Sequence, residues 1–257
     1  MLFDTRGRRR HVIRVVYAVL ALLMGASLFL VVGPFNIASL IGGSTTTETA
    51  KVLVEQAEKA EAKLVREPQN QPLLLTVVRT RVAAGNAQAE TNPQTGTPVL
   101  TPEALESYEK ASEAWDIYLK QAESPNPAGA ALMAGAFFTL AENVSEIEPI
   151  DEAIAGAAKA QRIAAEAQPS VGTLTTLAIY EFFNGNFAAG EKVGKEAQAM
   201  ASGAQAKEIK KQMAEYRNAG ESWEKQKNTY AKTEKERGKE SLENPFGGLG
   251  GGSGLGE

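Results

Sequence analysis

The chain has no cysteine, and its only histidine is His11, near the N-terminus. Disulfides and thiolate metal sites are therefore excluded. The rest of the chain also lacks the residue types that Ser-His-Asp catalysis, Cys-His catalysis and ordinary zinc sites need. Phosphate-binding loops, dinucleotide fingerprints and calcium-binding loops are missing from the sequence as well. We therefore predict no catalytic, metal or cofactor site, and a protein that is not an enzyme.

Beyond about residue 50, the sequence has few runs of Val, Ile, Thr or aromatic residues, which are the residue types that favour strands. Alanine, Glu, Lys and Gln, which favour or tolerate helix, dominate this region instead. The composition therefore predicts an all-α fold with almost no sheet.

One segment lacks charge entirely, namely the eighteen residues from Val15 to Val32. As a helix they would span roughly 27 Å, close to the thickness of a hydrocarbon core. Five arginines precede this segment, and no Lys or Arg occurs from residue 15 to residue 50. Because basic residues favour the cytoplasmic side, we predict a single transmembrane helix that contacts the inner membrane through residues 15–33. The N-terminus would then be cytoplasmic and the rest of the chain extracytoplasmic.

A cleaved signal peptide is the alternative interpretation of this segment. Such a peptide also begins with basic residues, but its apolar stretch usually has about 7–15 residues and ends at a site of small residues. Here Gly25-Ala26-Ser27 falls inside the apolar run, and apolar character continues to Ile41. These features favour an anchor that remains part of the protein.

The composition divides the chain into six parts. We predict, in order, a basic cytoplasmic tail at 1–14, a transmembrane helix with an apolar extension at 15–41, a linker at 42–50, a helical-hairpin domain at 51–204, a capping helix at 205–243 and a Gly-rich tail at 244–257. The last part has too little apolar surface to offset the entropy of ordering, so we expect it to be disordered.

Prolines and capping residues predict where the helices of the domain begin. Gln71-Pro72, Thr101-Pro102 and Asn126-Pro127 each place a proline in a first turn, where its missing N–H is harmless. Gly85-Asn86 predicts the end of the helix that Gln71 begins, and turn residues predict a long loop over 87–100. Further helices are expected from about 48 to 66, after Pro149-Ile150-Asp151, from 170 to 184, from 187 to 201 and from about 205 onward.

A repeat-like pattern lies between residues 174 and 197. Large apolar, small and aromatic residues, a glycine between two helices and a small residue on the second helix follow one another, at Leu174, Leu177, Ala178, Phe182, Gly185, Phe187 and Ala197. This run resembles a tetratricopeptide repeat (TPR), with Gly190 where the family has its small residue early in the second helix. Looser matches extend the resemblance over about residues 71–201, at Ala157, Ala164, Pro169, Ala111, Trp115 and Pro125.

The resemblance implies a degenerate array of stacked antiparallel hairpins, a TPR-like α-solenoid. The concave surface of such an array holds extended peptides or helices. An ordinary helical bundle is the alternative, because its core residues would show the same helical periodicity.

Four apolar or aromatic residues recur at intervals of seven in the last third of the chain, at Ile209, Tyr216, Trp223 and Tyr230. They would share one side of a long charged helix, but the positions that would complete a coiled-coil seam are mostly polar. We therefore predict a helix that caps the last hairpin. Pairing with a second copy of the chain through Trp223 and Tyr230 is the alternative.

Five residues are candidates for contacts with a partner, and Glu181 is the one candidate for chemistry. Glu181 has apolar neighbours that could raise its pKa for general-acid work, although an outward-pointing helix residue would give the same pattern. Long cations beside an apolar stripe are often simply solvated, which is the alternative for the two arginines. The partner candidates are Arg79, Arg81, Tyr180, Phe183 and Trp223.

The net charge of the chain is −4, and the two sides of the membrane segment differ in charge. Residues 1–33 contain five arginines and one aspartate, so the remainder has 22 basic and 30 acidic residues, a net charge of −8. An acidic domain without a basic stripe argues against nucleic-acid binding.

Taken together, these features predict a membrane-tethered bacterial scaffold that binds protein or peptide partners outside the cytoplasmic membrane. In architecture it resembles single-span, repeat-bearing factors of protein export or envelope assembly, which is an analogy of fold only. A structural, self-associating membrane protein is the second hypothesis, and a carboxylate-based enzyme is the third.

Overall fold

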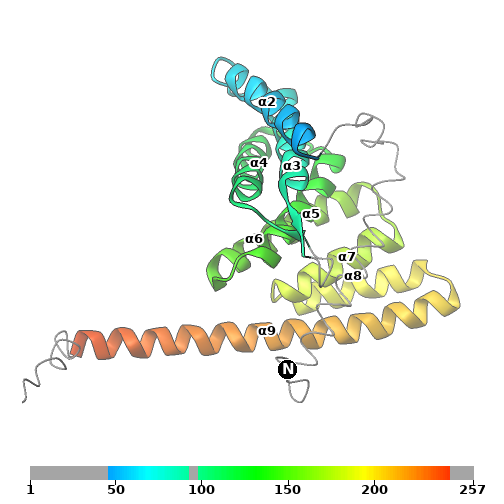
Figure 1. The fold of residues 1–257 in the computed structure, drawn as a ribbon. Coiled ribbons are helices and arrows are strands. Elements are labelled where there is room, and N and C mark those ends of the chain that lie inside the picture. The colour runs from blue at the N-terminus through cyan, green and yellow to red at the C-terminus, as the bar shows by residue number, and fades with distance from the viewer. Residues whose placement is uncertain (1–45, 93–97, 244–257) are drawn as a thin grey trace, which may run out of the picture.

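The computed structural model of the chain describes residues 46–92 and 98–243, with side chains from Glu48 to Thr233. This part is all-α, as the composition predicts (Figure 1). Its helices are α2 (Thr46–Leu64), α3 (Gln71–Gln88), α4 (Pro102–Gln121), α5 (Pro127–Asn143), α6 (Ile147–Ala167), α7 (Val171–Phe183), α8 (Phe187–Met200) and α9 (Gly203–Glu243). The strands β1 (Glu90–Thr91) and β2 (Pro98–Val99) form one short antiparallel pair between α3 and α4.

Side-chain N-caps explain where three of these helices begin. Asn70, Thr101 and Asn126 each precede a helix with a proline in its first turn. In each case the side-chain oxygen accepts a hydrogen bond from the backbone N–H three residues later, at 3.1, 3.1 and 2.8 Å. Each cap satisfies a donor that the helix itself leaves unpaired, which fixes the starting residue.

Three boundaries differ from the prediction. Helix α3 continues past Gly85 to Gln88, because this glycine packs inside the helix pair against Tyr108 instead of ending the helix. Helix α6 begins at Ile147, before Pro149, which occupies the first turn where no backbone N–H is required. Helix α2 begins at Thr46, so it includes the second half of the segment predicted as a linker.

Packing is sequential along the chain. Helix α3 packs against α2 and α4, α5 packs against α6, and α7 packs against α8. The hairpins are joined by contacts of α5 with α3 and α4, and by contacts of α6 with α7. In Figure 1 they follow one another from α2 at the top to α7 and α8 below, so the domain is an elongated array of hairpins.

Helix α9 lies across the last hairpin, in contact with both α7 and α8 (Figure 1). Ile209 and Tyr216 are buried on its inner side, Trp223 is half-buried, and Tyr230 is 54% exposed. The side predicted from the seven-residue spacing therefore faces the domain along the first part of α9. Beyond this first part, the orange and red part of α9 in Figure 1 extends past the other helices.

No helix in the two described segments combines the length and the apolar character needed to cross a membrane. The predicted transmembrane helix at 15–32, the basic tail at 1–14 and the Gly-rich tail at 244–257 all lie outside the described residues.

Candidate functional site

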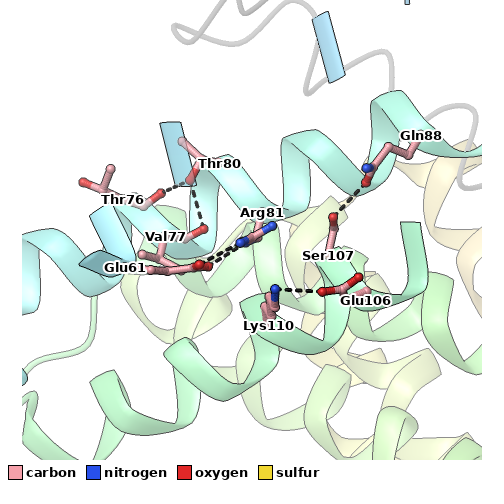
Figure 2. Close-up of polar contacts among 9 residues, drawn as sticks. All are labelled: Glu61, Thr76, Val77, Thr80, Arg81, Gln88, Glu106, Ser107 and Lys110. Atoms are coloured by element: carbon pink, nitrogen blue, oxygen red, sulfur yellow. Dashed lines mark hydrogen bonds and ion pairs between the residues drawn. The ribbon is translucent and has the colours of Figure 1, made fainter. Parts of the chain in front are cut away.

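Arg81 is buried in an ion pair that joins α3 to α2 (Figure 2). Its side chain is 3% exposed, and it donates through Nε and Nη2 to the two carboxylate oxygens of Glu61 at 2.6 and 2.7 Å. These hydrogen bonds hold the pKa of Arg81 above its ordinary range, although burial acts in the opposite direction. A buried guanidinium needs such a two-point partner, so the pair ties the first two helices together.

The two arginines proposed for partner contacts therefore differ. Arg79 is exposed and has no ion-pair partner among the described residues, as expected of a solvated cation. Arg81 is not solvated, because its donors are directed at Glu61. Of the two, Arg79 is the one whose charge a partner can reach.

Polar contacts also join α3 to α4 near this ion pair. Ser107 lies 2.7 Å from the side chain of Gln88, as Figure 2 shows. The hydroxyl of Tyr108 donates to Asn86 Oδ1 at 2.6 Å, and burial raises the pKa of this tyrosine to about 12. These contacts satisfy polar groups that the close approach of the two helices removes from water.

Glu181 does not point outward. It is 1% exposed, it forms an ion pair with Arg162 of α6, and it accepts a hydrogen bond from Asn186 Nδ2 at 2.9 Å. The interpretation of Glu181 as an outward-facing helix residue is therefore wrong. Because both carboxylate oxygens are engaged by neighbouring side chains, the arrangement connects α6, α7 and the start of α8.

The aromatic candidates pack within the domain. Tyr180 is 5% exposed and stacks on Phe138 with ring centroids 5.2 Å apart, and its burial raises its pKa strongly. Phe183 is half-buried and meets Tyr216 of α9 edge-on at 6.5 Å. Their ring surfaces are thus largely covered by intramolecular contacts.

Trp223 takes part in a junction between α9 and α6. Its indole N–H donates to Asp151 Oδ1 at 3.2 Å, and Lys227 Nζ lies 3.0 Å from Asp151 Oδ2 and 2.5 Å from Glu224 Oε1. In the sequence, Asp151 serves only to place the start of a helix. Nothing in the local sequence pairs it with residues more than 70 positions away.

The side of α5 that faces solvent is lined mainly by small residues, whereas the exposed side of α3 also carries a charge. On α3, Thr76 and Arg79 are exposed one turn apart. On α5, Ala128 is exposed, Leu132 and Gly135 are partly exposed, and a Cβ on Gly135 would meet no atom within 4 Å. Since α3 and α5 pack against each other, these sides are a candidate surface for a polypeptide partner.

A small-molecule or metal site has less support in the described part of the chain than a surface for a polypeptide partner. Among the described side chains, no three His, Cys, Asp or Glu residues come close enough to hold a metal ion. A hollow on the outer side of α8 is shallow and open to solvent, and it is lined by Ala188, Glu191, Lys192, Lys195, Glu196 and Ala199 of that helix alone.

Comparisons of the chain with protein-family models, with curated proteins and with solved structures gave no match.

Proposed function

We propose that the chain is a membrane-tethered scaffold whose extracytoplasmic helical domain binds protein or peptide partners. The anchor is the uncharged segment at 15–32, oriented by the preceding arginines. By analogy of architecture, the process served is protein export or envelope assembly in a bacterium.

The observation that carries the proposal is the sequential packing of helical hairpins, closed at one end by α9. In such an array each unit buries its apolar side against its neighbours, and an extended surface remains free for ligands. The array supports a TPR-like arrangement at its best-matching hairpin. There a Cβ on Gly190 would lie 2.6 Å from the Phe182 ring and 3.0 Å from the carbonyl oxygen of Ala178. A small residue at this position lets α7 and α8 approach closely, as the resemblance implies.

The partner surface that we propose is formed by the solvent-facing sides of α3 and α5. Small side chains on α5 let the backbone of a bound peptide or helix come close, and Arg79 on α3 supplies an unpaired charge for an acidic group of the partner. The buried candidates Arg81 and Tyr180 would support this surface indirectly, by holding α3 and α7 in place.

Site-specific photocrosslinking in native membranes tests this assignment. A photoreactive residue replacing Arg79 should trap a specific foreign polypeptide, whereas the same residue replacing Lys195, exposed on α8, should not. Equal capture from both positions would contradict a partner site on α3 and α5, and so would capture from neither.

Self-association is the second candidate function, because Tyr230 is exposed on the projecting part of α9. Trp223 supports it less, since its indole already bonds to Asp151. A crosslinker at Tyr230 that traps only a second copy of the chain, with the product lost on Trp223→Ala, would favour a structural protein over a scaffold for foreign partners.

A further inference from the structure

Helix α9 is attached to two successive hairpins in different ways. Its extensive packing is with α7 and α8, through the buried side chains Ile209 and Tyr216. Helix α9 approaches α7 closely at Gly220, where a Cβ would lie 2.4 Å from the carbonyl oxygen of Phe182. This apolar packing fixes the first part of α9 on the last hairpin.

The polar contacts of α9 with the preceding hairpin are made by Asp151. One carboxylate oxygen accepts the Trp223 indole N–H at 3.2 Å, and the other lies 3.0 Å from the Lys227 ammonium. Trp223 and Lys227 are four residues apart and therefore share one side of α9. Glu224, 2.5 Å from the same ammonium, holds Lys227 from the adjacent turn.

The relative lengths of α6 and α7 explain why this attachment is needed. Helix α6 has 21 residues and α7 has 13, and the short turn at 168–170 brings the end of α6 next to the start of α7. The first turns of α6 therefore extend past the end of α7. The hydrogen bond and the ion pair that join α6 to α7 lie further along α6, at Gln161 and Arg162, so Asp151 belongs to the part of α6 that extends beyond α7.

We propose that the contacts of Asp151 with Trp223 and Lys227, here called the clasp, form reversibly and set the angle between the α5–α6 hairpin and α9. Asp151 is 38% exposed and Lys227 is 18% exposed, so dissolved ions can reach and screen their attraction. Loss of the clasp frees the start of α6 from α9 while the apolar packing on α7 and α8 remains.

The part of α9 beyond the clasp amplifies this angle. Residues 228–243 continue as helix for about 24 Å. A small rotation at Asp151 therefore displaces the far end of the helix by much more than it displaces Trp223. The clasp is independent of the proposed function, because it concerns contacts within the chain and requires neither a partner nor a membrane anchor.

The lack of native cysteine allows a direct test in the full-length protein in detergent. Cysteines replacing the exposed Lys159 on α6 and Lys232 on α9 would bear spin labels, and pulsed dipolar spectroscopy would measure the distance between them. We expect one narrow distance distribution in the parent protein. It should broaden and shift in Asp151→Ala, and to a lesser extent in Trp223→Phe, which removes the indole N–H donor and keeps an aromatic ring. Salt at 1 M should broaden the parent distribution without further effect on Asp151→Ala.

The matched control is Glu152→Ala, which removes an exposed carboxylate from the same turn of α6 and spares the clasp. Its distribution should stay narrow. Equal broadening in Glu152→Ala would overturn the proposal, because it would assign the effect to charge at the start of α6. An unchanged distribution in both Asp151→Ala and Trp223→Phe would overturn it as well, and Trp223→Phe provides this test even if Asp151→Ala does not fold.

Discussion

Gly220 on α9 and Phe182 on α7 are packed so closely that a Cβ on the glycine would lie 2.4 Å from the Phe182 carbonyl oxygen. The neighbouring atom belongs to the backbone of a helix, so it cannot move aside as the end of a flexible side chain can. This contact places the capping helix directly on the last hairpin.

Replacement of Gly220 with alanine should therefore destabilise the domain, even though alanine is the better helix former. The strain of overpacking should cost about 1–3 kcal/mol. Gly135→Ala is the matched change, because its Cβ would enter open space within a helix, and it should stabilise by about 0.5–1 kcal/mol. Urea unfolding measures both, and stabilisation by Gly220→Ala would contradict the close contact.

The Arg81–Glu61 pair should contribute more to stability than the exposed cation on the same helix. Glu61→Ala leaves a guanidinium that is 3% exposed without its partner. Because Glu61 itself is about one-third exposed, we expect a loss at the lower end for a buried pair, about 2–3 kcal/mol. Arg79→Ala should change the free energy of unfolding little. Equal effects of the two changes would show that Arg81 is hydrated in solution.

Stability should fall at alkaline pH because of Tyr108. Burial raises its pKa to about 12, whereas an unfolded tyrosine titrates near 10. The unfolded chain thus loses this proton first, so the contribution of Tyr108 is complete below pH 10 and is lost between pH 10 and 12. The loss is on the order of 3 kcal/mol. Tyr108→Phe should lower the free energy of unfolding by a constant amount between pH 6 and 9. Above pH 10, the free energy of unfolding of this variant should fall less steeply with pH than that of the parent protein. Parallel curves for the two proteins over the whole pH range would contradict this.

Glu181→Gln should affect stability and leave partner capture intact. The change removes the charge that Arg162 and Asn186 contact inside the domain, at a cost of about 1–3 kcal/mol. Thermal unfolding would measure the loss, and photocrosslinking from position 79 below the transition would measure capture. A stable variant that has lost its activity in cells would instead support a chemical role for this carboxylate.

Local signals predict most of the helix starts because the responsible contacts lie within three residues. Asn70, Thr101 and Asn126 cap their own helices and need no other part of the chain. The end of α3 is different. Glycine is typical of a helix end, but Gly85 lies inside α3 and gives room to Tyr108 of another helix.

Burial of the charged residues could not be predicted for the same reason. Arg81 and Glu181 are paired with Glu61 and Arg162, which lie 20 and 19 residues away on neighbouring helices. Periodicity places a residue on one side of a helix, but it does not identify the residue that faces it. Asp151 contacts Trp223 of α9, which lies 72 residues further along the chain, and no local sequence pattern indicates this contact.

Labelling of single cysteines in intact spheroplasts would determine on which side of the membrane the helical domain lies. Lys232→Cys, exposed on α9, and Thr5→Cys, in the basic tail, would be treated with a membrane-impermeant maleimide in the otherwise cysteine-free chain. We expect the cysteine at position 232 to be labelled without lysis and the cysteine at position 5 to be labelled only after lysis. Labelling of position 232 only after lysis would contradict it.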